Sequence, residues 1–467
     1  MSFDRGLAQT RFGYGRSPEV AGPETVAQMM AQLRGPDVAA EQFAIPKDDV
    51  FYERISELFA HRQAVRQAQK GSDDREKRDV LFQKNRKRAH GQILGFMMTE
   101  LQRRVWTQDA LRERLVAFWA DHFSAPGKNI YYRYLAVSHV EHAIRPHVTG
   151  RFEDLLIAAV THPQMLVYLN QDVSIGPNSR TARYRKGKRP AGLNENLARE
   201  ILELHSLGVT GDYTQADVRQ LAELLTGLTT GVGKPARFLD KRAEPGAEEV
   251  LGKTYGGRRA GLDDIHAVLR DLARHPDTAG YIAWKLARHF VSDVPDAELI
   301  ASLQRRYLET DGDLAEVTQA LLEHPAAWAP LKDGQGNFKR PELFVSSALR
   351  ALAVPEARMK AAKPAEIMRL VMHPLRFMGQ PWRTPLGPDG FEEADAYWLS
   401  AQGLGARLQW ALAAPAAVMT RLPDPRDFVQ TALGPEAPAA VRFAAKAAEN
   451  RQEGVALVLM SPAFQRI

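Results

Sequence analysis

The sequence predicts an all-α protein, an irregular array of many helices with no substantial sheet. Apolar residues recur at helical spacing along most of the 467 residues, and we find no convincing series of strands with alternating apolar and polar residues. The connections between helical stretches are short, which favours an irregular array over a four-helix bundle. Amphipathic stretches are expected at residues 92–123, 134–146, 152–168, 262–274, 278–291, 297–308, 313–323, 340–353 and 404–420.

Local signals mark where several of the helices begin. Thr214 and Asp217 form a variant of the capping box, apolar residues follow at helical spacing from Val218, and Gly227 ends the element. Four His-Pro dipeptides occur among the predicted helices. In the first three, an apolar helix ends at the histidine and the proline enters the first turn of the next helix. These dipeptides begin at His162, His275, His324 and His373.

The composition is that of a folded globular protein, with 45% hydrophobic and 25% charged residues. We expect one compact helical unit over residues 1–467, although the length alone would allow two to three cores. Residues 61–90 are predicted to be a charged helical insertion. Residues 172–193 are predicted to be a basic, mobile loop, either a solvated tip or a flap that recruits an anionic group.

Several classes of protein are excluded by what the sequence lacks. Without cysteine the chain has no disulfide, no thiolate zinc site and no cysteine nucleophile. No apolar run reaches eighteen residues, which predicts no membrane span, and no secretory signal follows Met1, so the chain as given is expected in the cytoplasm. The net charge of 62 − 56 = +6 is only mildly basic, and we expect no specific nucleic-acid binding.

The helix expected over residues 194–205 carries the best candidate for a functional site. At about 100° per residue, its polar side chains share one arc that holds Glu195, Asn196, Arg199, Glu200 and Glu203. In one interpretation the arc is a ladder of ion pairs at i,i+4 spacing. In the other it faces a cleft, where Glu200 and Glu203 share a divalent cation or a proton.

Two histidines lie on apolar helix faces, His205 on the opposite side of the same helix and His122 on the helix that ends near residue 124. A buried imidazole needs partners for its nitrogens, and such residues are commonly satisfied core histidines. The alternative is that the two rings meet in one buried polar centre, with Asp121 or Glu200 nearby. His139 and His142 also have the spacing of metal ligands, but they are expected as a surface pair.

A segment rich in proline and glycine, residues 379–391, is a candidate binding loop. Rigid turns that present aromatic rings such as Trp382 suit a sugar or peptide ligand. A packed structural loop that covers a helix end is the alternative.

A specific combination of motifs occurs at residues 11–15, 118–124, 162–169, 194–196, 198–200, 203–205, 213–215, 217–218, 285–286, 289–291, 339–341 and 388–390. Their resemblance to a large bacterial family known only as a domain of unknown function, numbered eighteen hundred, spans nearly the whole chain. It implies no established reaction, but it implies a neighbour, because members are often encoded beside an exported protein similar to the phosphatase and sulfatase superfamily, and many are themselves exported. The chain departs from the family at Leu228, where tryptophan is common, and it has no histidine in the stretch before Leu251.

Our first functional hypothesis is an enzyme with a polar Glu/His/Arg cleft that acts on an anionic or glycan-type substrate, with a divalent cation as a possible cofactor. The catalytic candidates are His122, Glu200, Glu203 and His205. The substrate-binding candidates are Asn194, Asn196, Arg199, Tyr213, Gln215, Asp217 and Trp382. The second hypothesis is a non-enzymatic scaffold that binds a phosphatase- or sulfatase-like partner, and it predicts an exposed patch that includes Trp382, Phe391 and Trp398.

Overall fold

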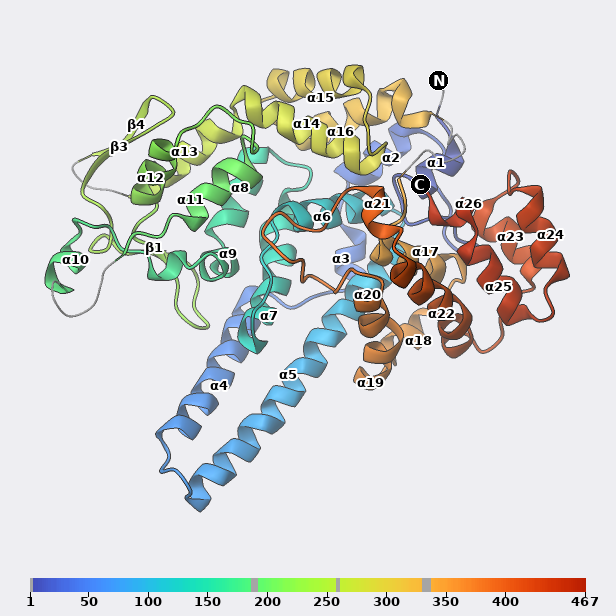
Figure 1. Cartoon of the computed structure of the whole chain (residues 1–467), viewed down its shortest axis with the longest axis horizontal. Helices are drawn as coiled ribbons and strands as arrows, with labels where there is room; N and C mark the ends of the chain where they lie inside the picture. The colour runs from blue at the N-terminus through green and yellow to red at the C-terminus, as the bar shows by residue number, and fades with distance from the viewer. Residues whose placement is uncertain (1–2, 186–191, 258–260, 330–336) are drawn as a thin grey trace.

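The computed structural model describes residues 3–185, 192–257, 261–329 and 337–467. The described chain is predominantly helical, which confirms the predicted fold class (Figure 1). Its sheets are two antiparallel pairs of strands. They are β1 (Leu228–Thr229) with β2 (Arg237–Phe238), and β3 (Gly246–Val250) with β4 (Lys253–Gly257).

The helices pack around two apolar cores, and the prediction that they form one folding unit stays a prediction. The first core contains fully buried rings such as Trp119, Phe123 and Phe152. Its helices are α1 (Arg5–Thr10), α2 (Val26–Arg34), α6 (Ala110–His122), η1 (His139–Ile144), α8 (Phe152–Thr161), α9 (Pro163–Tyr168), α11 (Asn196–Glu200), η4 (Ile201–His205), α12 (Gln215–Leu224), α13 (Leu262–Ala273), α14 (Pro276–Phe290), α15 (Ala297–Glu309), α16 (Leu314–Glu323) and η5 (Pro325–Trp328).

The second core lies beside the first and is centred on Phe344 and Trp410. It is built by α4 (Asp48–Gln67), α5 (Asp73–Trp106), α7 (Ile130–Ser138), α17 (Pro341–Ala351), α18 (Glu356–Lys360), α19 (Pro364–Ile367), η6 (Met368–Met372), α20 (His373–Phe377), α22 (Ala401–Val418), α23 (Pro425–Leu433), α24 (Ala439–Ala447), α25 (Arg451–Met460) and α26 (Pro462–Gln465). The remaining short helices are α3 (Val38–Gln42), η2 (Arg145–His147), η3 (Gln171–Val173), α10 (Arg180–Arg185) and α21 (Asp395–Trp398).

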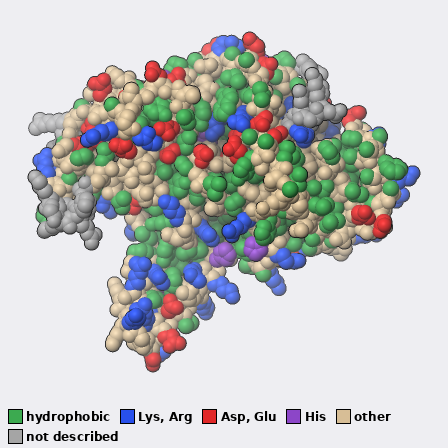
Figure 2. Space-filling model, in the orientation of Figure 1, with side chains coloured by type: hydrophobic (Ala, Val, Ile, Leu, Met, Phe, Trp, Pro, Cys, Tyr) green, Lys and Arg blue, Asp and Glu red, His purple; other side chains and the backbone are tan. Residues whose placement is uncertain are grey.

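Helices α4 and α5 form an antiparallel hairpin that projects from the body, and residues 61–90 are its outer part (Figure 1). Ser72 caps α5 by accepting a hydrogen bond from the backbone N–H of Arg75. Side chains of both charges cover this projection in Figure 2. Charged, solvated faces explain why so long a helix has few buried residues before Ala89.

The predicted helix starts are confirmed where local hydrogen bonds determine them. Thr214 and Asp217 form the capping box of α12. His162, His275 and His324 each accept a hydrogen bond from a backbone N–H two residues later, with proline in the first turn. The single stretch expected at 92–123 is wrong, because the chain leaves the helix after α5 and a new N-cap at residue 109 starts α6.

The basic segment expected at 172–193 is described only in part, because residues 186–191 lie outside the described residues. The described part is attached to the segment before β3. Arg180 pairs with Asp240 at 2.6 Å, and the amide of Asn178 donates to Glu244 at 2.6 Å. Among the described residues, no helix is long and apolar enough to cross a membrane.

Candidate functional site

The helix expected over residues 194–205 is regular only in its first half. It starts as α11 and continues as the π-helical turn η4, which ends at His205. Ser206 supports the wide turn, because its hydroxyl donates to the carbonyl of Ile201 at 2.6 Å. Single π turns occur often at functional sites. The uniform 100° spacing used for the prediction therefore fails beyond Glu200.

The exposed side of this helix is an ion-pair ladder, as the first interpretation of the arc predicted. Arg199 lies 3.1 Å from Glu203 and 3.7 Å from Glu195. It also donates to Gln215 at 2.7 Å, and Gln215 in turn donates to Glu195 at 3.0 Å. These groups are partly solvated, so each pair contributes only a few tenths of a kcal/mol.

Other predicted substrate-binding residues have local structural roles. The side chain of Asn194 accepts the backbone N–H of Asn196 at 2.9 Å, next to the start of α11. Asp217 completes the capping box and accepts the backbone N–H of Leu251 at 2.7 Å. Burial raises the pKa of the Tyr213 phenol, and the neighbouring carboxylate of Glu203 raises it further. These contacts hold the α11–α12 corner together.

Glu200 is the carboxylate that stands outside the ladder. Burial, then the neighbouring charges of Glu203 and Asp389, raises its pKa to about 7. Asp389 comes from the loop before α21, and its charge, after the effect of burial, also raises the pKa values of Tyr168 and Tyr281. Glu200 and the two phenols are partly buried, and the exposed Asp389 is within electrostatic range of all three.

Behind this surface the two predicted histidines do come together. The rings of His122 and His205 lie 5.7 Å apart. Lys285 Nζ lies 3.1 Å from His122 Nδ1, and His122 Nε2 lies 3.3 Å from the carbonyl oxygen of His205. Since an ammonium only donates, the neutral imidazole of His122 accepts at Nδ1 and donates from Nε2. Burial lowers the pKa of both His122 and Lys285.

His205 is fully buried, and burial lowers its pKa to about 3. Neither ring nitrogen makes a hydrogen bond of normal geometry within the described residues, although the backbone of His122 acts on the ring and raises its pKa against burial. The ring also lies 5.0 Å from that of Phe123. A neutral imidazole without partners is costly to bury. Its position therefore differs from that of a satisfied core histidine.

A charge network fixes the segments around this centre. Arg340, at the start of α17, lies 2.6 Å from Asp121 and 2.5 Å from Glu393. His289 lies 3.3 Å from Glu393. Burial raises the pKa of Asp121. Arg340, acting against the effect of burial, holds the pKa of Glu393 well below its usual range.

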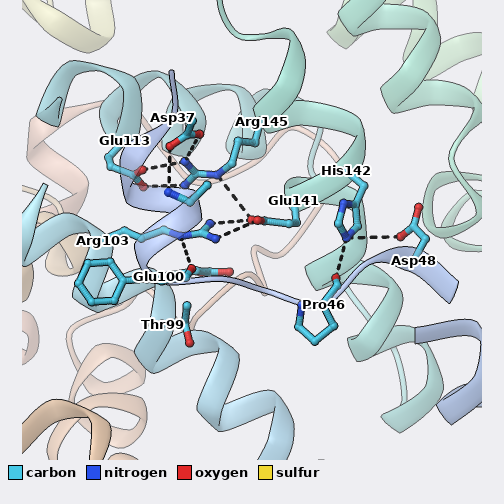
Figure 3. Close-up of polar contacts among 12 residues, drawn as sticks. Asp37, Pro46, Asp48, Thr99, Glu100, Arg103, Glu113, Glu141, His142 and Arg145 are labelled. Carbon is cyan, nitrogen blue, oxygen red and sulfur yellow. Dashed lines mark hydrogen bonds and ion pairs between the residues drawn. The ribbon is translucent and has the colours of Figure 1, made fainter. Parts of the chain in front are cut away.

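Beside this network lies a charged cavity of about 110 Å³ that the sequence analysis missed. Its lining includes six arginines and five carboxylates. Figure 3 shows part of the lining, with Glu141 bound by Arg103 at 2.7 and 2.9 Å and approached by Arg145 at 3.5 Å. The arginines are Arg103, Arg104, Arg114, Arg145, Arg340 and Arg383, and the carboxylates are Glu100, Glu113, Asp121, Glu141 and Glu342.

Trp382 lies in the second core and has a structural role. It is 9% exposed, and its indole N–H donates to Glu100 at 3.1 Å. Trp398 is 1% exposed. The exposed aromatic patch expected for a scaffold protein is therefore wrong, because both tryptophans fill the interior rather than the surface.

His139 and His142 were predicted to lie at the surface. The prediction is wrong for His139, which is buried and donates to the carbonyl of Ala159 at 3.1 Å. The π turn η1 starts at this residue and changes the phase of the helix. His142 lies 2.9 Å from the carbonyl oxygen of Pro46 (Figure 3). No group of three or more metal-ligating side chains occurs in the described part of the chain.

A family model described as a protein of unknown function, DUF1800, matches residues 8–466. The chain belongs to the DUF1800 family. No curated protein and no solved structure matches it.

Five distant segments of this DUF1800 protein meet at the polar centre, and each contains residues that carried the resemblance described above. Sequence analysis proposed His122 and His205 but not Lys285, although Lys285 occupies a core-facing position of α14 between Ile282 and His289. A charge at such a spacing is the signal that would have found it. The segments that meet are 118–124, 203–205, 285–291, 339–341 and 388–390.

Gly390 holds the 388–390 loop of this DUF1800 protein against α6. Its φ is +85°, and a Cβ placed there would lie 2.7 Å from the carbonyl oxygen of Asp121. We expect Gly390→Ala to destabilise the protein by about 1–3 kcal/mol and to release the loop, because both the strain and the clash must be relieved. Hydrogen exchange of residues 386–394 measures the release.

Gly405→Ala is the control for this substitution. Gly405 lies within α22 and has open space around its Cβ position. Alanine is expected to stabilise it by up to about 1 kcal/mol. Equal exchange of the 386–394 segment in both variants would contradict the role assigned to Gly390.

Proposed function

We propose that this DUF1800 protein is an acid–base hydrolase of glycan-type substrates, with Glu200 as the general acid. The proposal rests on the position of Glu200, half-buried within electrostatic range of Asp389 and outside the ion-pair ladder that occupies Glu203. A carboxyl group with a pKa near 7 is protonated in a useful fraction at neutral pH, as a general acid requires.

The surroundings of Glu200 support a sugar-like substrate. Tyr281 is within electrostatic range of Asp389, and its ring is nearly parallel to that of Trp284, 6.3 Å away at an interplanar angle of 17°. Trp284 is 37% exposed, and the Arg288 guanidinium lies 5.2 Å from the centre of its ring. Aromatic faces of this kind suit the apolar face of a sugar ring, and hydroxyl groups of the substrate suit carboxylates and phenols. Glycosidic bonds are commonly cleaved by two carboxyl groups with different protonation states.

The proposed step uses both carboxyl groups. Glu200 donates its proton to the oxygen of the bond that breaks, and Asp389 accepts a proton from the attacking water, whose oxygen joins the released carbon. Solvent then returns the two groups to their starting protonation states. Lys285 is a cation in electrostatic range of Asp389, and its hydrogen bond to His122 orients it.

Glu200→Gln is expected to lower kcat by about 10²–10⁴-fold, because glutamine cannot donate the proton. Glu203→Gln on the same helix is the matched control, and we expect less than about a tenfold effect because Glu203 is bound to Arg199. Release of reducing ends from neutral, carboxylated and sulfated polysaccharides measures both. Activity of the wild-type protein should fall as the pH rises above about 7, when Glu200 loses its proton. The proposal is refuted if wild-type protein cleaves none of the three classes, or if both variants retain activity.

The same substitution has an expected effect on stability. The folded-state pKa of Glu200 is about 7, above its ordinary value. The contribution of this carboxyl group to the free energy of unfolding is therefore present at low pH and is lost as the pH rises through about 7. Glu200→Gln should therefore be more stable than wild type at about pH 8, by roughly 1 kcal/mol after allowance for solvent screening, and similar to it at about pH 5. Urea unfolding at both pH values measures the difference, and a variant that is less stable at pH 8 would contradict the assignment.

A further inference from the structure

Arg114 is the buried guanidinium of the charged cavity that lacks a carboxylate partner. It lines the cavity and is 5% exposed. Its Nε and Nη2 atoms are fully buried and have no hydrogen-bond partner in the part of the chain that the structure describes. The guanidinium carbon lies 5.3 Å from the centre of the Phe290 ring, so one face of the group is covered by an aromatic ring.

The other five arginines of the cavity are all paired. Arg103, Arg104, Arg145, Arg340 and Arg383 each lie within 2.9 Å of a carboxylate oxygen. The five carboxylates of the lining are thereby used. This pairing leaves none of the lining carboxylates for Arg114.

The nearest charges also set Arg114 apart. Tyr14 and Glu393 favour its charge, whereas Arg340 and Arg104 repel it. Tyr14 is a phenol whose pKa burial raises, and Glu393 is already bound by Arg340 and His289. His289 also lines the cavity, and its Nε2 atom has no partner among the described residues. Burial lowers the pKa of Arg114 to about 10, so the group keeps its charge at neutral pH. An unpaired buried cation is costly unless an anion accompanies it.

We propose that the cavity is a binding site for a small oxyanion, a carboxylate or an inorganic oxyanion, held by Arg114. A guanidinium prefers ligands that offer two oxygens in one plane, and carboxylate and phosphate groups do so. The cavity has room for several water-sized groups, enough for a small anion but not for a polymer. This site is separate from the Glu200 surface, and it holds whether or not the protein cleaves glycans.

Two measurements test the site. Thermal unfolding of the full chain is followed with sodium acetate, phosphate or sulfate, each against sodium chloride at equal ionic strength. We expect an increase in Tm of about 2 °C or more with the matching anion and none with chloride. Acetate distinguishes a carboxylate site from an inorganic oxyanion site, for which phosphate or sulfate would act instead. The increase must be absent in Arg114→Met, because sulfate and phosphate also stabilise proteins without binding a site.

The second measurement is the sign of the effect of Arg114→Met without added oxyanion. Removing an unpaired buried charge should raise Tm by about 1–3 °C, whereas Arg103→Met, which unpairs Glu141, should lower it. A fall in Tm in Arg114→Met, or failure of this variant to fold, overturns the proposal. Equal anion effects in the variant and in wild-type protein overturn it as well.

Discussion

Replacing Arg145 with methionine is expected to lower the free energy of unfolding by about 3–5 kcal/mol. Arg145 binds Glu113 through two hydrogen bonds, at 2.8 and 2.7 Å, and also binds Asp37 at 2.9 Å (Figure 3). Glu113 is 3% exposed, so its charge would remain buried without a cation. Urea unfolding at neutral pH measures the loss.

Arg199→Met is the matched control, because Arg199 also pairs with two carboxylates but lies at the surface. Its loss is expected to cost less than about 1 kcal/mol. The double variant Arg145→Met with Glu113→Gln should recover part of the stability, since the orphaned charge is removed together with its partner. Similar losses for Arg145 and Arg199 would show that burial does not determine the strength of these pairs.

Replacing Arg340 with leucine is expected to have an effect of similar size, about 3–5 kcal/mol at neutral pH. The substitution leaves two buried carboxyl groups, Asp121 and Glu393, without their shared cation. Because these groups join α6 to the segment before α21, the substitution should also loosen the polar centre. We therefore expect faster hydrogen exchange in residues 386–394, an effect that Arg145→Met should not produce.

The pH dependence of Arg340→Leu has a definite sign. In wild-type protein Arg340 depresses the pKa of Glu393, so this group stabilises the fold above its ordinary pKa and loses that contribution as the pH falls. In the variant, burial without a cation should raise the pKa values of both Asp121 and Glu393. The two groups then destabilise the folded state as the pH rises and they lose their protons. The stability difference should grow between about pH 4 and about pH 7. A constant difference across this range would contradict the role of Arg340.

Local patterns predicted those parts of the fold that depend on neighbours within about four residues. The capping box at Thr214 and the His-Pro starts involve hydrogen bonds between residues two or three positions apart. The pairing of Arg199 with Glu195 and Glu203 likewise depends on i,i+4 spacing. The π turn at Ile201 could not be predicted in this way, because the periodicity is almost the same until the turn widens.

The candidate site was predicted less completely than the fold. His122 and His205 were identified because a polar group on an apolar face needs a partner wherever the chain folds. Their distance from one another, the approach of Lys285, and the position of Asp389 beside Glu200 depend on contacts between segments far apart in the chain. The ion pair of Arg340 with Asp121 spans 219 residues.

Local sequence patterns were sufficient to establish that this protein is helical, where several of its helices begin, and that residues 194–205 include polar groups in unusual positions. Which of those groups lie close together depended on how distant segments pack. The tertiary structure placed Glu203 in a solvated ladder, Glu200 beside Asp389, and Arg114 in a cavity whose other arginines are paired. The physical reason is that helix periodicity and capping are local, whereas the burial and pairing of a charge depend on the packing of every segment around it.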